Sequence, residues 1–206
     1  INAGLARHVL IYRSMYEASA RKHAFANSLV KVGERQRGGF AWYAPYHVHA
    51  AALQQSLYFN AYVHKSGIRP EQQAMIAINQ RRNAGMNPHA IYRDPITLDD
   101  YMASPRIAGP LRIYDCDVPI DGSAAIIVSA MDAARDCRNP PIRIEAVGSS
   151  MQYRNSWTQL AEVDTQAQPL VAEMMWSRTD LTPRDVDIAE LYDGFSFHTL
   201  NWLENF

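Results

Sequence analysis

The sequence has little of several features that mark particular classes of protein. Its 206 residues include only two cysteines, Cys116 and Cys137, which form no C-x-x-C pair, and this argues against a disulfide framework. No run approaches the roughly eighteen consecutive apolar residues of a transmembrane helix, and no signal-peptide pattern opens the chain. Lys and Arg number 20 against 21 Asp and Glu, so the basic surface that nucleic acids or anionic membranes require is missing. We therefore predict a soluble, cytoplasmic protein without a nucleic-acid or membrane partner.

Signals for cofactors and metals are also absent. The sequence contains no glycine-rich phosphate loop of either nucleotide-binding pattern, which argues against a nicotinamide or ATP site. His47 and His49 have strand-type spacing for two metal ligands, but no third ligand lies near them in sequence, and zinc sites take at least three ligands from the protein. Cys116 stands between Asp115 and Asp117, whose charges would disfavour a thiolate. We predict no metal and no cofactor.

The patterns that are present predict an α/β protein. Apolar residues at helical spacing indicate helices over residues 49–64, from Pro70 to about Gly85, over 169–176 and from Phe197 onward. Thr97 has the features of an N-cap for a short helix, and Thr182 with Pro183 opens another. Five apolar or alternating segments predict strands: residues 9–12, 111–114, 124–129, 142–147 and 186–191. The segment 124–129 is apolar without alternation, which is typical of a strand covered on both faces.

Both ends of the sequence lack ordinary boundaries. The first residue is Ile1 rather than Met, and it leads almost directly into an apolar strand. The last helix stops at Phe206 without a Gly, an Asn or a basic last turn. We expect the chain to be part of a longer one.

Six segments, in the same order along the chain, resemble the thiolase superfamily, and more narrowly its lipid-transfer-protein and steroid side-chain aldolase branch. They are Arg81–Ala84 with Asn87–Ala90, Ser104–Leu111, Asp115–Cys116, Asp121–Ala125, Leu181–Asp187 and Ala189–Phe195. The resemblance implies a thiolase fold of α-β-α-β-α layers in two similar halves. Residues 1–138 would be the late part of the N-terminal half, with a helical loop domain inserted at about 33–110, and residues 139–206 would start the C-terminal half. The family's nucleophilic Cys would precede Ile1, and its later His and Cys loops would follow Phe206.

The loop Tyr192-Asp193-Gly194-Phe195 carries the chemical interpretation. The matching loop reads Asn-Glu-Ala-Phe in ordinary thiolases and His-Asp-Cys-Phe in sterol-carrier-protein-type thiolases. A phenol can donate a hydrogen bond to a thioester oxygen, or a proton to an enolate. This favours a retro-aldol step, with Tyr192 as acid or donor and the base supplied from a later loop. The plainer interpretation of Tyr192 is a strand-end side chain whose hydroxyl caps a backbone group.

The neighbours of Tyr192 are further candidates. Asp193 either orients the phenol as a catalytic residue or caps the final helix, and His198 either faces the site or is an ordinary core or surface histidine. Gly194 would let the backbone turn tightly or approach the ligand. Trp42 and Tyr43 could line a wall for a polycyclic substrate, but packing is the preferred interpretation, because aromatic side chains dominate core contacts in general.

Three functions follow, in order of preference. The first is a lyase that cleaves a β-hydroxyacyl-CoA with a steroid side chain to a ketone and a short acyl-CoA. The second is an acyltransferase of the thiolase type, which requires an upstream Cys and an acyl-enzyme. The third is a non-catalytic lipid- or acyl-CoA-binding protein. The resemblance also implies a homodimer and a small OB-fold partner protein with a zinc-binding segment.

Overall fold

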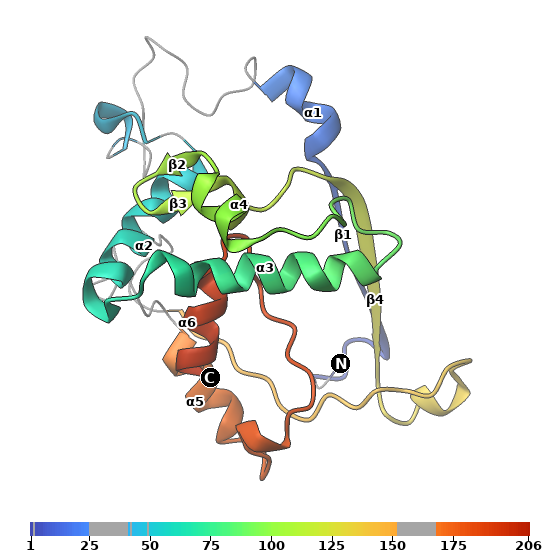
Figure 1. Ribbon diagram of the computed structural model, residues 1–206. Helices are drawn as coiled ribbons and strands as arrows, with labels where there is room; N and C mark the ends of the chain where they lie inside the picture. Colours follow the sequence, from blue (N-terminus) through green and yellow to red (C-terminus); the bar gives the residue numbers. More distant parts are fainter. Residues whose placement is uncertain (2, 25–40, 42, 49, 152–167) are drawn as a thin grey trace. The chain divides into compact units, whose positions relative to one another are not determined.

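The computed structural model describes residues 1, 3–24, 41, 43–48, 50–151 and 168–206 (Figure 1). The chain divides into two compact units, residues 1–29 with 118–145 and residues 30–117 with 146–206. Together they contain helices and strands, so the predicted α/β class is confirmed at this level. Within the described ranges, no helix combines the length and the apolar character needed to cross a membrane.

The first unit is built on a two-stranded antiparallel ribbon. Strand β1 (His8–Tyr16) pairs with β4 (Asp121–Ser129) in unbroken register, from His8 opposite Ser129 to Tyr16 opposite Asp121. Helix α1 (Glu17–Ala24) follows β1, and a 3-10 turn, η4 (Ala134–Asp136), follows β4. The predicted strands 9–12 and 124–129 are confirmed. The expectation that 124–129 is covered on both faces is wrong for the described residues. Ile126 and Ile127, which point to opposite faces of the strand, are both exposed.

The helices of the second unit follow the predicted pattern. Helix α2 (Ala51–Ser66) ends at Gly67, whose φ of 67° is the left-handed conformation that favours glycine. Helix α3 (Pro70–Met86) begins with its proline, and α4 (Leu98–Ala103) is capped by Thr97, which accepts a hydrogen bond from the Asp100 amide. Helix α5 (Gln168–Trp176) and helix α6 (Phe197–Asn205) complete the unit. Figure 1 shows α3 as the long green helix, with α2 and α4 beside it.

The described strands of the second unit form one short hairpin. Strand β2 (Arg106–Ala108) pairs with β3 (Leu111–Arg112) across a turn at Gly109, whose φ is 53°. The predicted strand 111–114 ends early because the Asp115 carboxylate accepts the Arg112 amide and draws the chain into a 3-10 turn, η3 (Ile113–Asp115). Another 3-10 turn, η6 (Pro183–Asp185), is closed by Thr182 and Asp185, as the Thr-Pro pattern predicts.

Two predicted strands do not form. Residues 142–147 and 186–191 have no regular secondary structure, and Ile142, Ile144, Val186 and Ile188 are exposed. A strand is stabilised by hydrogen bonds to a neighbouring strand, and no described segment pairs with either one. Among the described residues, these two segments therefore lack the neighbouring strand that their apolar patterns would need.

Two apolar clusters hold the second unit together. In the first, Phe59 of α2 stacks on Phe197 of α6 with ring centroids 5.1 Å apart, and Tyr58, Tyr62, Leu111 and Phe195 complete it. The second joins Ala74 and Ala77 of α3 to Ile96 and to Tyr101 of α4. The residues just before α6 are thereby packed between α2 and the β2–β3 hairpin.

Candidate active site

The loop that enters α6 is fixed by a short backbone pairing. The Ser196 amide donates to the Asp115 carbonyl at 2.9 Å, and the Asp117 amide donates to the Gly194 carbonyl at 3.1 Å. Between these bonds, Cys116 and Phe195 form an isolated antiparallel bridge. The three residues 115–117 thus hold residues 194–196 as a neighbouring strand would.

The Asp115 side chain lies behind this pairing and is almost fully buried, at 2% exposure. Its carboxylate accepts hydrogen bonds from the Tyr101 hydroxyl at 2.8 and 2.9 Å and from the Ser196 hydroxyl at 2.6 Å. The Arg112 amide donates at 2.8 Å and the Gln73 side-chain amide at 3.4 Å. Burial, with the Asp115 charge as the next cause, raises the pKa of Tyr101, so that phenol stays a hydrogen-bond donor.

Tyr192 projects from the loop with 62% of its surface exposed. Its carbonyl accepts a hydrogen bond from the Trp202 indole at 3.0 Å, and its ring stacks on His198 with centroids 5.9 Å apart. The ring folds back over Gly194, where a Cβ would stand 2.7 Å from the Tyr192 Cζ. Gly194 thus leaves room for the Tyr192 ring, and its approach to a ligand stays a prediction.

His198 is buried beneath the Tyr192 ring, at 5% exposure. Its Nε2 lies 3.1 Å from the Gln55 Oε1, and its Nδ1 has no hydrogen-bond partner among the described residues. The rings of Phe195 and Phe197 contact it at centroid distances of 5.8 and 4.4 Å. Burial lowers the pKa of His198 to about 4, so the imidazole is neutral at pH 7 and acts on Tyr192 as an apolar platform.

Asp193 faces the other way. It is exposed and accepts a hydrogen bond from the side-chain amide of Gln80 on α3. The N-cap position of α6 is occupied by Ser196, so the interpretation of Asp193 as a helix cap is wrong. Gln73 and Gln80 both reach the loop from α3, and their spacing of seven residues puts them on one face of that helix.

Trp42 and Tyr43 are the two aromatic residues that the sequence suggests for a substrate wall. Trp42 lies outside the described residues. Tyr43 lies next to Tyr58 of α2, and burial raises the pKa of both phenols. Tyr43 therefore lies beside α2.

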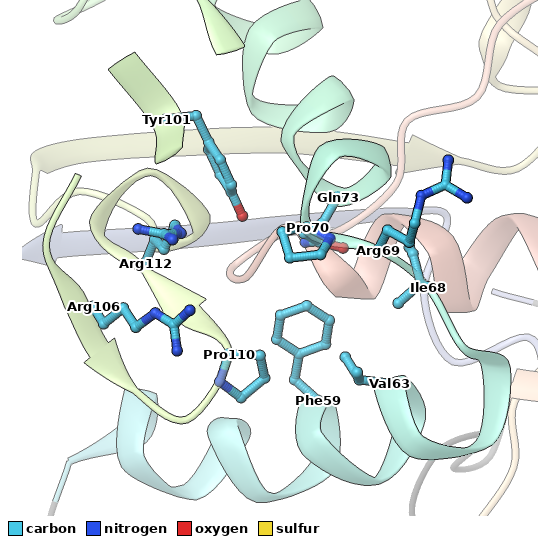
Figure 2. A pocket seen from close by; sticks show the side chains of 10 residues that line it. All are labelled: Phe59, Val63, Ile68, Arg69, Pro70, Gln73, Tyr101, Arg106, Pro110 and Arg112. Atoms are coloured by element: carbon cyan, nitrogen blue, oxygen red, sulfur yellow. The ribbon is translucent and has the colours of Figure 1, made fainter. Parts of the chain in front are cut away.

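A small pocket of about 100 Å³ opens between α2, the start of α3 and the β2–β3 hairpin (Figure 2). It is lined by Phe59, Val63, Ile68, Arg69, Pro70, Gln73, Tyr101, Arg106, Pro110 and Arg112. Figure 2 shows Arg106 and Arg112 on the hairpin side, while the Arg69 guanidinium points away from them.

The two hairpin arginines make this pocket electropositive. The Arg112 side chain donates to the Ser104 carbonyl at 2.8 Å and lies over the Tyr101 ring at 5.7 Å. Among the described residues, neither Arg106 nor Arg112 forms an ion pair with a carboxylate. Arg112 is buried and Arg106 is exposed at the pocket mouth. Two guanidinium groups on one side of a small pocket make it suited to an anionic group.

The sequence did not single out this pocket, or the buried cluster around Asp115. Asp115 stands in one of the six segments that carry the resemblance, but the sequence predicts no role for its side chain. Burial raises the pKa of the neighbouring Cys116 thiol to about 11. One signal was available, since Asp115 is a charged residue directly after the apolar segment 111–114. The described residues contain no cluster of three or more His, Cys, Asp or Glu side chains that could hold a metal ion.

Comparison with known proteins gives a consistent set of relatives. The chain is 32% identical over 212 residues to the 17-hydroxy-3-oxo-4-pregnene-20-carboxyl-CoA lyase of Mycobacterium tuberculosis, covering 99% of this chain and 54% of the relative. It is 29% identical to a steroid side-chain-cleaving aldolase of Thermomonospora curvata, with coverages of 99% and 54%. A solved Ltp2-ChsH2(DUF35) aldolase matches all of this chain and 53% of its own, with a TM-score of 0.77 and 29% identity. The chain thus spans about half the length of these relatives. No protein-family model matches it.

Proposed function

The chain belongs to the thiolase-like superfamily, in its Ltp2 steroid side-chain aldolase branch and related to sterol carrier protein 2, and we propose that it serves a retro-aldol cleavage. The substrate would be a β-hydroxyacyl-CoA thioester with a steroid side chain. The products would be a ketone and a shorter acyl-CoA. The names of the two relatives, a carboxyl-CoA lyase and a side-chain-cleaving aldolase, support this substrate class.

The observation that carries the proposal is the exposed phenol of Tyr192 on an otherwise fixed loop. A base removes the proton of the β-hydroxyl, the Cα–Cβ bond breaks, and its electron pair forms the enolate of the CoA thioester. Tyr192 then donates a hydrogen bond to the enolate oxygen or a proton to its carbon. As the family resemblance implies, the base would come from a later loop. Among the described residues, His198 is buried with a lowered pKa, and Asp193 is bonded to Gln80.

The neighbours of Tyr192 have supporting roles in this scheme. His198 supports the ring as a neutral platform, and Gly194 leaves room for it. Asp193 fastens the loop to α3 rather than taking part in proton transfer. Trp42 and Tyr43 remain proposed only as parts of a wall for the steroid.

The arginine pocket would receive an anionic group of the CoA moiety. Arg106 and Arg112 offer guanidinium donors suited to phosphate oxygens, and the N-terminal end of α3 adds a favourable dipole. Because CoA carries phosphates at one end and the thioester at the other, one molecule would be held at the pocket while it reacts at Tyr192.

We also propose the larger arrangement that the family implies. It comprises five α-β-α-β-α layers in two halves, with boundaries near residues 33, 110 and 138, and a homodimer. A small OB-fold partner with a zinc-binding segment would complete the assembly. The solved aldolase that pairs Ltp2 with ChsH2(DUF35) supports a partner of that kind.

The test uses the full-length protein together with any protein that co-purifies with it. It is mixed with a β-hydroxyacyl-CoA that bears a steroid nucleus, and the products are separated by chromatography. The proposal predicts a steroid ketone and a short acyl-CoA in equal amounts. Acyl transfer to free CoA through an acyl-enzyme detected by mass spectrometry would instead identify a thiolase-type acyltransferase.

A further inference from the structure

The buried Asp115 carboxylate connects the wall of the arginine pocket to the Tyr192 loop. Its donors come from four segments: Gln73 of α3, Tyr101 of α4, the Arg112 amide of β3, and Ser196 of the loop. The first three residues also line the pocket. One carboxylate is therefore shared by the two parts of the proposed site.

A charge in this position needs an explanation. Moving a carboxylate out of water is expensive, and a well-packed apolar group would often be as stable. What several converging hydrogen bonds add is a defined geometry, because each donor must lie within a narrow range of distances and angles. The Asp115 cluster thus fixes where residues 194–196 lie relative to α3 and α4.

The Tyr192 side chain has little packing of its own to orient it. Most of its surface is exposed, and it contacts His198 on one side and Gly194 on the other. Its direction therefore follows from the backbone, which Trp202 holds at the Tyr192 carbonyl and residues 115–117 hold at 194–196.

We infer that Asp115 is a positioning residue for Tyr192, acting through Ser196 and the backbone of residues 194–196. This inference rests on the proposed function, in which the Tyr192 phenol is the catalytic group. A displacement of about 1 Å at a reacting group can lower the rate by roughly a hundredfold, so a loosened loop reduces turnover even when the protein is folded and binds its substrate.

The test compares Ser196→Ala and Asp115→Asn with wild type in the full-length protein. Ser196→Ala removes one donor and keeps the other hydrogen bonds of Asp115, so it serves if Asp115→Asn fails to fold. Hydrogen exchange is measured at the amides of positions 196 and 117, and kcat and KM are measured on the steroid β-hydroxyacyl-CoA. Asp185→Asn is the matched control, since Asp185 accepts hydrogen bonds from Thr182 in a turn of its own.

We expect both amides to exchange at least about tenfold faster in the two variants, and kcat to fall by about tenfold or more in both. KM should stay unchanged in Ser196→Ala, which keeps the hydrogen bonds of Asp115 to residues that line the arginine pocket. The control should alter neither quantity. Wild-type exchange at both amides, or a wild-type kcat in a variant whose amides exchange faster, overturns the inference. If wild type does not cleave the thioester at all, the proposed function fails. The amide exchange rates then decide separately whether Asp115 anchors the loop. Wild-type exchange rates in both variants would show that it does not.

Discussion

The Tyr192 ring lies against the Cα of Gly194, so close that a Cβ there would stand 2.7 Å from the Cζ of the ring. The backbone at Gly194 is not in the left-handed region, so alanine is compatible with the local conformation. The methyl group of alanine would instead overlap the Tyr192 phenol. Because most of the ring surface is exposed, an added methyl group pushes the ring outward and does not unfold the loop.

Gly194→Ala should accordingly separate activity from stability. We expect the free energy of unfolding to change by less than about 1 kcal/mol, while kcat falls by at least about tenfold because the phenol is displaced. Denaturant unfolding and steady-state kinetics on the same preparation measure the two effects. Gly148→Ala is a contrasting control, because a Cβ there would overlap the backbone carbonyl of Val171, and it should destabilise the protein. Wild-type kcat in Gly194→Ala would show that the ring position does not matter.

His198 makes stability depend on pH in a defined direction. In the unfolded chain its pKa is near 6.5, and burial lowers the folded value to about 4. Between these values the unfolded chain binds a proton that the folded protein does not, so stability falls as the pH is lowered from about 6.5 to about 4. From pH 7 to pH 5 this one group should cost about 2 kcal/mol.

The variant His198→Phe should remove that pH-dependent part. Its ring keeps the aromatic contacts, but the buried Gln55 side chain loses its partner, which costs about 1–3 kcal/mol at every pH. Denaturant unfolding at pH 7 and pH 5 measures how much unfolding free energy each protein loses between the two pH values. His64→Gln, at an exposed histidine of α2, is the control and should lose as much as wild type. An identical loss of stability in wild type and His198→Phe would mean that His198 is not buried as a neutral group.

The arginine pocket predicts an effect on binding alone. Arg106→Gln removes a charge that contributes to phosphate binding, and KM for the CoA thioester should rise by about tenfold with kcat unchanged. With a pantetheine thioester, which lacks the phosphates of the nucleotide end, the same variant should behave like wild type. Arg184→Gln is the control, since Arg184 is exposed and does not line the pocket. Equal effects on both thioesters would exclude a phosphate contact.

Local signals in the sequence predicted most helices of the second unit. Pro70 at the start of α3 and Thr97 before α4 act within one turn of the chain, so neither depends on distant residues. The strands are a different case. Residues 142–147 and 186–191 have suitable composition, but a strand also needs a partner, and the described residues supply none. Composition alone could not reveal this.

The candidate site was predictable only where local sequence signals define it. Tyr192 and Gly194 stand in a short motif, and the motif indicated a loop before the last helix. The role of Asp115 depends on Ser196, which is 81 positions away along the chain. Such long-range pairs leave no periodic signal in a single sequence. The neutral state of His198 likewise follows from burial, which the spacing of residues near α6 did not settle.

The most direct test of the central claim is the Tyr192→Phe variant of the full-length protein, assayed on a steroid β-hydroxyacyl-CoA. The variant keeps the ring and its stacking on His198 and loses only the hydroxyl, so folding and KM should match wild type. Tyr46→Phe, which alters another exposed tyrosine of the same unit, is the matched control and should keep full activity. We predict that kcat for Tyr192→Phe falls by at least about a hundredfold, as expected for loss of a proton donor. A loss of less than about tenfold would contradict proton donation by this phenol.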